Sequence, residues 1–520
     1  MSSADAVVIG AGPNGLVAAN LLADAGWDVL LLEAQPEVGG AVRSARDVHP
    51  DFVHDTFSAF HPLAVASPAI RALGLDRFGL EWTQAPAVVG TPFPDGRWAV
   101  LHRDRLDTAA CLDTFAAGDG DAWLRLCARW DEIGEPLLAA LLSPFPPVAA
   151  GLRTAGRLAD GGGLGAARDL LAPAQSLIRR WFQGEAAEAL LVGNAAHADI
   201  PLHRPGSGLF GLLLSMLGQQ VGFPAPRGGA GSLSTALVRR FTSYGGSVRT
   251  GTRIEEVLVS GGRAVGVRTT DGEVVMARRA VLADVPAPTL YGRLLPWARL
   301  PARVRLGMRR FRWDPGTVKV DWALSGPVPW SAAPARPPGT VHVGATVPEV
   351  QATYAQIAAH AVPDRPFLLL GQMAASDPSR APAGGEAMWA YSHVPQLARF
   401  DAGDAGIAGV WDAADCERMA DRMQARIQEL APGFGARVLA RRVLGPRELE
   451  ARDENLVGGA INGGTARLRQ QLFLRPVPGL ARPRTPVRGL YLASASAHPG
   501  GGVHGACGAN AARAALAHGR

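Results

Sequence analysis

The chain has 520 residues, of which 48% are hydrophobic and 19% charged, and its formal net charge is +6. This balance is typical of a folded protein of two or three domains and excludes a disordered or coiled-coil chain. The longest apolar run, at 209–223, contains Ser215, Gln219 and Gln220, so we expect no membrane-spanning helix.

The positive charge is spread along the whole chain. Arginines are scattered singly among Ala and Gly, and Lys319 is the only lysine. We therefore expect no nucleic-acid binding, and we leave open a weak peripheral contact with an anionic membrane surface. The N-terminus has no basic segment before its first apolar run, which predicts a cytoplasmic protein without a cleaved signal peptide.

The four cysteines are far apart in the sequence: Cys111, Cys127, Cys416 and Cys507. Without a C-x-x-C pair, we expect neither a metal site nor a redox-active dithiol. Any redox chemistry would then need a cofactor.

The first forty residues predict one βαβ unit. Residues 5–10 (DAVVIG) and 28–33 (DVLLLE) are short apolar runs typical of buried parallel strands. Residues 14–25 between them have helical periodicity, and Gly26 ends that helix.

The turn between the first strand and the helix reads GAGPNG. Gly10 permits a tight turn, Gly12 lets the backbone approach a pyrophosphate, and Gly15 allows the helix to pack closely on the strand. Pro13 and Asn14 open the helix, whose N-terminal amides favour an anion. The context of strand, turn and helix predicts a dinucleotide-binding site at these five residues.

An acidic residue and a second glycine pair follow. Glu33 ends the second strand eighteen residues after the last glycine of the turn (33 − 15 = 18), and Ala34 follows it, where the acid that binds a ribose hydroxyl is expected. Gly39, Gly40 and Arg43 fit a loop around the far side of an extended dinucleotide. This loop favours FAD over a nicotinamide cofactor, and the alternative is a surface turn with a solvated arginine.

The middle of the chain divides into three parts. Residues 71–222 have helical spacing broken by proline and glycine clusters and predict a helical insertion. The glycine run at 161–165 follows no strand, so we do not accept it as a second nucleotide site. A glycine turn, a helix and three strands are predicted at 227–282, and alternating antiparallel strands at 317–324, 366–373 and 388–394, before a helix at 413–430.

A second glycine-rich loop precedes the last helix. Residues 493–510 read ASASAHPGGGVHGACGAN, between a predicted strand at 489–493 and an Ala-rich helix. The backbone amides of such a loop can lie against a flat ring and point to its electron-rich edge. A flexible tail is the alternative, but a tail would not be followed by a helix.

Together these motifs resemble the phytoene desaturase-like flavoproteins, relatives of carotenoid desaturases and isomerases, retinol saturase and flavin amine oxidases. The resemblance covers GAGPNG, the acid and VGG loop, PRGGAG at 226–231, the Ala-Asp pair at 283–284 and GLYLASASAHPGGGVHGACGANAA. It implies FAD as cofactor, a backbone contact of Val257 with adenine, and Ser496 near the ribityl chain. It also implies Gly502, Val503 and His504 near the flavin ring.

The fold implied by the resemblance is α/β and has two interleaved domains. Residues 1–70, 222–290 and 480–520 would form a Rossmann-type FAD-binding domain of the glutathione reductase kind. Residues 71–221 and 291–479 would form an α+β substrate domain with an antiparallel sheet and a helical lid.

Single residues that could carry chemistry have competing interpretations. His504 is our candidate for catalysis, by donating to the flavin or assisting proton removal, and the alternative is a histidine that packs in its loop. Cys507 is interpreted as a packing residue and not as a covalent flavin attachment.

Two polar groups in the middle of the chain are also interpreted as structural. Trp389, Tyr391 and His393 alternate onto one face of a strand, where we favour packing over a role in roofing a pocket. His197 and Asp199 are interpreted as part of a capped loop, with a place in a lid as the alternative.

The function predicted is that of an FAD-dependent dehydrogenase or desaturase with a hydrophobic small-molecule substrate. The apolar runs at 137–142 and 209–217 are expected to line its pocket, unless they only fill the core. Oxygen, a quinone or a nicotinamide would accept the electrons. A flavin-dependent polyene isomerase or saturase, an amine oxidase and a non-catalytic flavin-binding protein remain alternatives, and the oligomeric state is not predicted.

Overall fold

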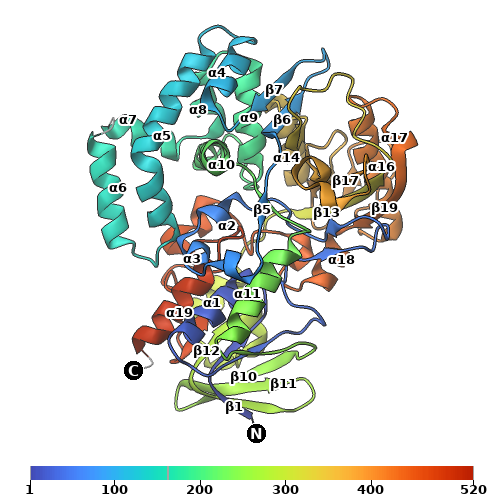
Figure 1. Ribbon diagram of the computed structural model, residues 1–520. Coiled ribbons are helices and arrows are strands. Elements are labelled where there is room, and N and C mark those ends of the chain that lie inside the picture. Colours follow the sequence, from blue (N-terminus) through green and yellow to red (C-terminus); the bar gives the residue numbers. More distant parts are fainter. Residues whose placement is uncertain (1, 161–162, 519–520) are drawn as a thin grey trace.

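A computed structural model describes residues 2–160 and 163–518 and contains two large sheets, one in each half of the molecule. Figure 1 shows the N-terminal sheet with α1, α11 and α19 in the lower half, and a group of helices beside the second sheet in the upper half. Two residues of the glycine run at 161–165 lie outside the described residues.

The first sheet is the one predicted for the dinucleotide. Its strands run in the order β10 (Ile254–Ser260), β11 (Arg263–Thr269), β12 (Val274–Ala283), β1 (Ser2–Ile9), β2 (Val29–Leu32) and β9 (Ser247–Arg249), with β20 (Leu490–Leu492) beside β12. The pairs β12–β1, β1–β2, β2–β9 and β12–β20 are parallel, while β10, β11 and β12 pair antiparallel. The central strands are buried on both faces, which explains their continuous apolar sequences.

Three helices cover one face of this sheet: α1 (Pro13–Asp24), α11 (Gly231–Ser243) and α19 (Ala506–His518). The last helix approaches the first very closely, because a Cβ placed on Gly508 would lie 1.8 Å from the backbone oxygen of Asn14. Glycine at position 508 therefore brings the C-terminal motif against the start of α1, although the two are about five hundred residues apart in sequence.

The second sheet lies in the upper half of the molecule. Its order is β19 (Val438–Leu444), β13 (Gly316–Leu324), β17 (Glu386–Val394), β16 (Leu368–Gln372), β14 (Pro338–Val343), β6 (Ala87–Pro92) and β7 (Trp98–Leu101). All neighbours pair antiparallel except β14 and β6. Helix α16 (Ala413–Gln428) packs against β13 and β19.

The strands β6 and β7 correct the prediction of a wholly helical insertion. They fall inside residues 71–222, where the runs AVVGTP and WAVL are short and separated by the turn FPDGR. Apolar runs of this length do not distinguish a buried strand from a helix fragment. The two runs are strands because β6 pairs with β14, a partner more than two hundred residues later.

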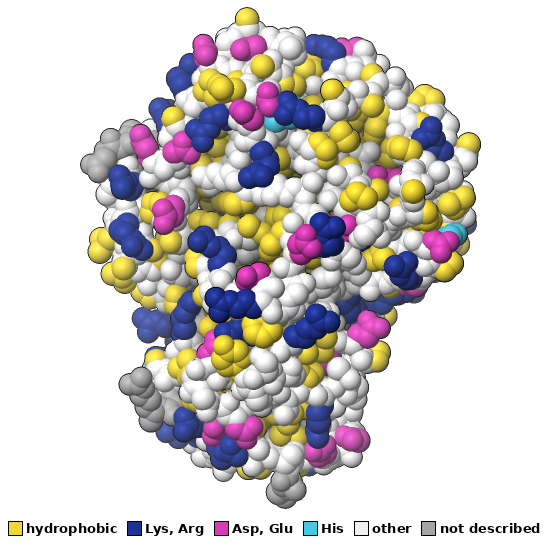
Figure 2. All heavy atoms as spheres, in the orientation of Figure 1, with side chains coloured by type: hydrophobic (Ala, Val, Ile, Leu, Met, Phe, Trp, Pro, Cys, Tyr) yellow, Lys and Arg dark blue, Asp and Glu magenta, His cyan; other side chains and the backbone are white. Residues whose placement is uncertain are grey.

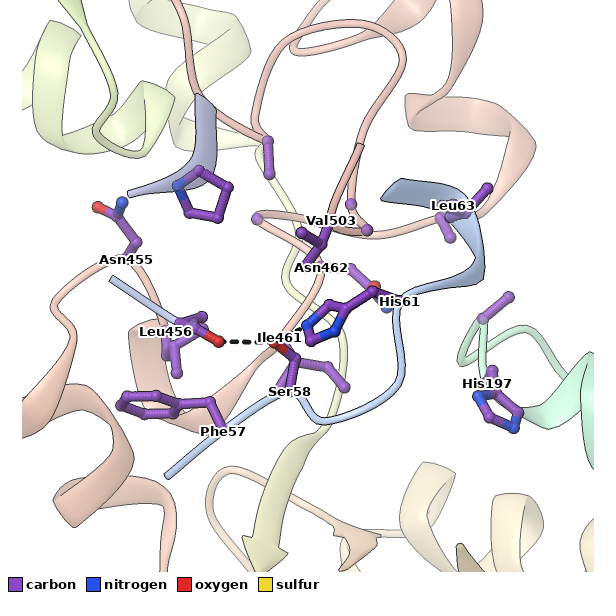
Figure 3. Close-up of a pocket in the computed structure, with 18 of the residues that line it drawn as sticks. Phe57, Ser58, His61, Leu63, His197, Asn455, Leu456, Ile461, Asn462 and Val503 are labelled. Carbon is purple, nitrogen blue, oxygen red and sulfur yellow. Dashed lines mark hydrogen bonds between the residues drawn. The ribbon is translucent and has the colours of Figure 1, made fainter. Parts of the chain in front are cut away.

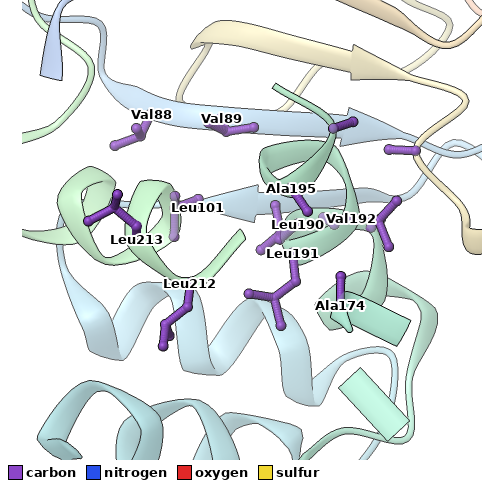
Figure 4. Close-up of a cluster of buried hydrophobic side chains, with 14 of the residues drawn as sticks. Val88, Val89, Leu101, Ala174, Leu190, Leu191, Val192, Ala195, Leu212 and Leu213 are labelled. Carbon is purple, nitrogen blue, oxygen red and sulfur yellow. The ribbon is translucent and has the colours of Figure 1, made fainter. Parts of the chain in front are cut away.

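Most of the rest of the insertion is helical. It contains α4 (Arg105–Asp113), α5 (Asp119–Leu142), α6 (Val148–Asp160), α7 (Gly163–Leu171), α8 (Ala174–Trp181), α9 (Glu185–Ala196) and α10 (Ser207–Val221). Figure 4 shows Val88 of β6 and Leu101 of β7 in one buried cluster with Leu190 of α9 and Leu212 of α10. None of the helices in the described part of the chain is long and apolar enough to cross a membrane.

Shorter elements connect these parts. They include α2 (Pro62–Ala66), α3 (Pro68–Arg71), α13 (Ala302–Arg309), α14 (Val347–Ala358), α17 (Phe434–Arg437), α18 (Pro446–Arg452), and the paired strands β3 (Ser44–Ala45) with β4 (His54–Asp55), β5 (Trp82–Thr83) with β8 (Ala225–Pro226), and β15 (Ala361–Val362) with β18 (Phe400–Asp401). The strands of the first sheet lie in residues 1–70, 222–290 and 480–520, and those of the second in 71–221 and 291–479.

Candidate active site

The glycine turn is held in place by contacts on both sides. Gly10 has a φ of +91°, which favours glycine, and a Cβ on Gly15 would lie 2.0 Å from the backbone oxygen of Gly10. The backbone N–H of Gly15 donates to Oδ2 of Asp284 over 2.8 Å. The N-terminus of α1 is thereby fixed against the ends of β1 and β12.

A cavity of about 370 Å³ lies beside this turn. Gly10, Glu33, Ala34 and Gly40 line it together with residues 252–254. Glu33 is almost fully buried, and its carboxylate accepts hydrogen bonds from the backbone N–H groups of Ala11 (2.7 Å) and Gln35 (2.8 Å). These two bonds fix an acidic group at the end of β2, where an adenosine ribose would need it.

Two buried carboxyl groups lie where this cavity meets a second one. Asp284 and Asp453 line both cavities, as do Gly12, Pro286 and Asn455. Burial raises the pKa of Asp284 to about 8 and that of Asp453 to about 6, and Glu33 nearby adds to both shifts. The Asp284 carboxyl is therefore protonated at neutral pH and does not oppose an anion at the glycine turn.

The second cavity has a volume of about 390 Å³ and a wall that is mostly apolar. On the dinucleotide side its lining includes Pro13, Asn14, Ser496, Gly502 and Val503. Much of the remaining wall is made by large hydrophobic side chains: Phe210, Leu213, Leu214, Phe223 and Trp389. Figure 2 shows hydrophobic side chains in a hollow near the middle of the molecule, with Lys and Arg side chains around it.

A histidine and a serine form a polar pair in this wall. Ser58 Oγ donates to the backbone oxygen of Ala41 over 2.8 Å, so it accepts from Nε2 of His61 at 3.1 Å. Figure 3 shows this pair near the centre of the cavity, between Phe57 and Val503. Complete burial lowers the pKa of His61 to about 4, so the ring is neutral.

The only lysine of the chain also lines the cavity. Lys319 lies on β13, and its Nζ donates to the backbone oxygen of Asp55 over 2.9 Å and to the carboxylate of Asp321. Arg442 donates to the other oxygen of Asp321 over 2.7 Å. Burial lowers the pKa of Lys319, and Asp321 opposes that effect.

Five predicted cofactor residues do not line either cavity: Gly15, Gly39, Arg43, Val257 and His504. Gly15 and Gly39 shape the backbone beneath the lining, and Gly39 has a φ of +117°. Arg43 donates to the backbone oxygens of Gly40 (3.0 Å) and Arg452 (2.6 Å) and lies over the ring of Phe57. Val257 lies on β10, where it pairs with Val267 of β11, and its side chain is fully buried, so its contact with adenine stays a prediction.

The geometry gives no support for catalysis by His504. Its Nδ1 accepts from the backbone N–H of Ala506 over 3.0 Å, at the start of α19, and its backbone oxygen accepts from Ser67 Oγ over 2.6 Å. Burial lowers the pKa of His504 to about 4. The ring fixes the loop that carries Gly502 and Val503 and does not line the cavity itself.

Three residues that we interpreted as structural line the larger cavity in the structure. Trp389 and Tyr391 line the cavity, as does His197, while His393 and Asp199 form a buried pair behind them at 2.8 Å. Sequence reasoning missed Lys319, His61, Asp453, Asn455 and Asn462 in the lining. Only Lys319 had a visible signal, as the single lysine in an alternating strand.

Of the two apolar segments expected to line the pocket, one does so and the other does not. From the run at 209–217, Phe210, Leu213 and Leu214 line the cavity, whereas Met216 is buried in the core. No residue of the run at 137–142 is among the lining residues in the described part of the chain, and Leu137 packs in the core around α5, so that part of the expectation is wrong. The side of α5 that is apolar faces other helices.

The residues present fit FAD. Two connected cavities meet at Gly12, where a Cβ would lie 2.9 Å from Oδ2 of Asp284 and a Cβ on Gly40 would lie 2.9 Å from the Cα of Gly12. Glycine at these two positions therefore lets the turn, the 39–40 loop and Asp284 lie close together where the cavities meet, as a backbone that approaches a pyrophosphate requires. The acid at the end of β2 suits the adenosine half, and the larger apolar cavity suits a flavin ring with a substrate.

Comparison with known proteins agrees with this fit. Residues 14–382 match the family model of flavin containing amine oxidoreductases. Pyridine nucleotide-disulfide oxidoreductase domain-containing protein 2 of Rattus norvegicus is 30% identical over 553 aligned positions, which cover 98% of this chain and 92% of the relative. One of the chains of limonene dehydrogenase from Castellaniella defragrans is 23% identical, over 98% of this chain and 94% of its own length.

A solved structure supports the fold. The crystal structure of an oxidoreductase from Methanosarcina mazei superposes with a TM-score of 0.64 at 16% identity, over 98% of this chain and 99% of the other. The expected α/β fold and the resemblance to flavin amine oxidases and their relatives are confirmed. The fold and the two cavities define an FAD-dependent oxidoreductase. The chain belongs to the flavin containing amine oxidoreductase family.

Proposed function

We propose that this enzyme is a dehydrogenase that introduces a carbon–carbon double bond into a small apolar substrate. The observation that carries the proposal is the wall of the larger cavity, where hydrophobic and aromatic side chains outnumber the charged ones and offer an apolar substrate most of its contacts. Removal of apolar surface from water contributes roughly 25 cal/mol per Å², so such a substrate needs few polar anchors.

The reaction must balance two electrons and two hydrogens. FAD, when bound, would supply the acceptor for a hydride that leaves a substrate C–H bond with its electron pair. The adjacent carbon loses a proton to solvent, and the electron pair of that second C–H bond forms the double bond. The two electrons finally pass to an external acceptor, which we propose to be oxygen, a quinone or a nicotinamide.

The cavity favours a small substrate over a long polyene. Its volume of about 390 Å³ must hold part of the cofactor as well as the substrate. The remaining space suits a hydrocarbon skeleton of terpene size. The relationship with the limonene dehydrogenase chain over nearly the whole length supports a substrate of this class.

An amine substrate is less suited to this site. A protonated amine would need a carboxylate or an aromatic cage, but Asp284 and Asp453 lie at the dinucleotide side, where the cavities meet. Lys319 brings an amino group of the protein itself to the lining. Asp199, a buried acid next to the lining residue Ala198, is already paired with His393 and Asn462.

The test is anaerobic reduction of the bound cofactor. We expect limonene and related cyclic terpenes to bleach the flavin absorbance and to form a product with one more double bond, while putrescine and cyclohexylamine leave the spectrum unchanged. Bleaching by the amines alone would overturn the proposal. Product formation only from pre-reduced enzyme would favour the isomerase or saturase alternative.

A matched pair of variants on α10 locates the substrate. Leu213→Ala enlarges the cavity, whereas Leu212→Ala removes the same atoms from the core next to it. Each substitution should cost about 2–5 kcal/mol of stability. Only Leu213→Ala should shift the preference toward larger terpenes, and an equal shift in both variants would show that the cavity is not the substrate site.

A further inference from the structure

A pair of histidines lies at the end of the larger cavity away from the glycine turn. His197 follows α9 and lines the cavity, and Figure 3 shows its ring at one side, opposite Phe57 and Asn455. Its Nε2 lies 3.0 Å from Nε2 of His342, which is on β14. One of these two nitrogens must donate a proton to the other.

The surroundings of His342 decide which nitrogen donates. Its ring is fully buried, and its Nδ1 has no partner among the described residues. The backbone of Gly193 on α9 packs directly on it, since a Cβ at that position would lie 2.0 Å from Nδ1. A buried N–H without an acceptor is rarer and more costly than an unused lone pair.

The proton of His342 is therefore on Nε2, and this group donates to His197. Burial lowers the pKa of His197 to about 3 and that of His342 well below its usual range, so both rings are neutral and carry one proton each. With its Nε2 accepting, His197 must carry its own proton on Nδ1.

The Nδ1–H group of His197 faces the cavity. Unlike His342, His197 keeps part of its surface accessible although protein surrounds it, and the accessible part belongs to the cavity lining. Its Nδ1 has no hydrogen-bond partner among the described residues, and the lining that it shares is mostly hydrophobic and includes Ala198 and Phe210. A neutral donor without a protein acceptor thus stands in a mostly apolar wall.

The second sheet separates His342, the partner of His197, from Lys319. His342 pairs with Leu369, Leu369 with Tyr391, and Tyr391 with Lys319, so the four residues form one row across four strands. Three strand spacings of about 4.8 Å separate the row's ends by roughly 14 Å. The cavity therefore has a cationic side chain in one part of its wall and an uncharged donor in another.

We propose that Nδ1–H of His197 is a binding site for the oxygen atom of a neutral acceptor group, a carbonyl most directly, on an otherwise apolar substrate. This inference rests on the proposed function, because it narrows the substrate class of the same cavity. A cation finds no acceptor at this nitrogen, and a carboxylate would lose its hydration for a single uncharged donor. His342 is a positioning residue that fixes the tautomer.

The first test observes the tautomer without any substrate. Nuclear magnetic resonance of the FAD-loaded protein with isotope-labelled histidine distinguishes protonated from bare ring nitrogens. We expect His197 protonated on Nδ1 and His342 on Nε2, with assignments from His197→Phe and His342→Leu. A proton on Nε2 of His197 would overturn the inference, whether or not the enzyme is a dehydrogenase.

The second test uses two probes with one carbon skeleton, the ketone menthone and the hydrocarbon menthane. Their dissociation constants come from the perturbation of the flavin spectrum in the oxidised holoenzyme. We expect the preference for menthone to fall by about three- to tenfold in His197→Phe, the loss of one neutral hydrogen bond, and to recover partly in His197→Asn.

The control variant changes the same end of the cavity without removing the donor. Phe210→Leu should weaken both probes by a similar factor and leave their ratio unchanged. An unchanged ratio in a folded, FAD-loaded His197→Phe variant would refute the inference. Because both probes are scored by binding alone, absence of turnover would count against the proposed function and not against this site.

Discussion

The carboxyl group of Asp284 should make FAD binding depend on pH. It lies where the two cavities meet and accepts a hydrogen bond from the N–H of Gly15 over 2.8 Å. Burial, with Asp453 and Glu33 nearby, raises its pKa to about 8. An ionised carboxylate at this place would repel the phosphates of a dinucleotide held at the glycine turn, so the protonated form binds FAD.

The size of the effect follows from this pKa. If only the protonated form binds, the dissociation constant scales as 1 plus ten to the power of the pH minus the pKa, so FAD should bind about tenfold more weakly at pH 9 than at pH 7. The variant Asp284→Asn keeps the shape of the side chain without its ionisation, and it should lack the tenfold change in affinity that Asp284 causes over this range.

The assay is fluorescence titration of FAD into cofactor-free protein between about pH 6 and pH 9. The same group also affects folding: the folded chain keeps a proton that the unfolded chain releases above about pH 4, so the free energy of unfolding should fall between about pH 4 and pH 8 by up to 1.4 kcal/mol per unit. Asp284→Asn should remove this contribution to the slope. Equal pH profiles of FAD affinity in the wild type and the variant would refute the reasoning.

Three further predictions concern the two ends of the chain. Gly508→Ala places a Cβ 1.8 Å from the oxygen of Asn14 and should lower the melting temperature and FAD content sharply, while Gly156→Ala, with open space around it, should change neither. Gly12→Val should abolish FAD binding in a folded protein, measured as flavin released by denaturation, because any side chain there fills the space between the cavities. Burial raises the pKa of Cys507 to about 12, so this thiol should resist alkylation in the native holoenzyme and Cys507→Ala should keep its turnover, and loss of activity in that variant would contradict the packing role.

The dinucleotide side of the molecule could be predicted because its signals are local. GAGPNG and Glu33 lie on one βαβ unit, and their chemistry depends on spacings that the sequence states directly. The strands β6 and β7 could not be recognised, since their apolar runs are short and their partner β14 is far along the chain. A motif alone was not enough for His504. Its position in the glycine-rich loop suggests a catalytic role beside the flavin, but its Nδ1 accepts a hydrogen bond from the backbone N–H of Ala506 at the start of α19.

The substrate side could not be predicted because it is assembled by strand register. His342, Leu369, Tyr391 and Lys319 come from four strands and lie in one row only because each pair is in register. A shift of one residue on any strand would move its side chain to the other face of the sheet. No spacing in the sequence records these alignments, so this wall of the cavity is assembled only when the sheet is formed.

The same assembly explains why the histidine pair remains uncharged. His197 reaches the sheet from α9, and Gly193 on the same helix lets the helix backbone lie directly against His342. A larger residue at position 193 would force the helix away and admit water to the gap, which would weaken the burial that lowers both histidine pKa values. The Nδ1–H donor of His197 therefore depends on Gly193, a residue that lines neither cavity. We expect Gly193→Ala to change the binding of menthone relative to menthane, because it alters the tautomer of His197 and leaves the cavity wall as it is.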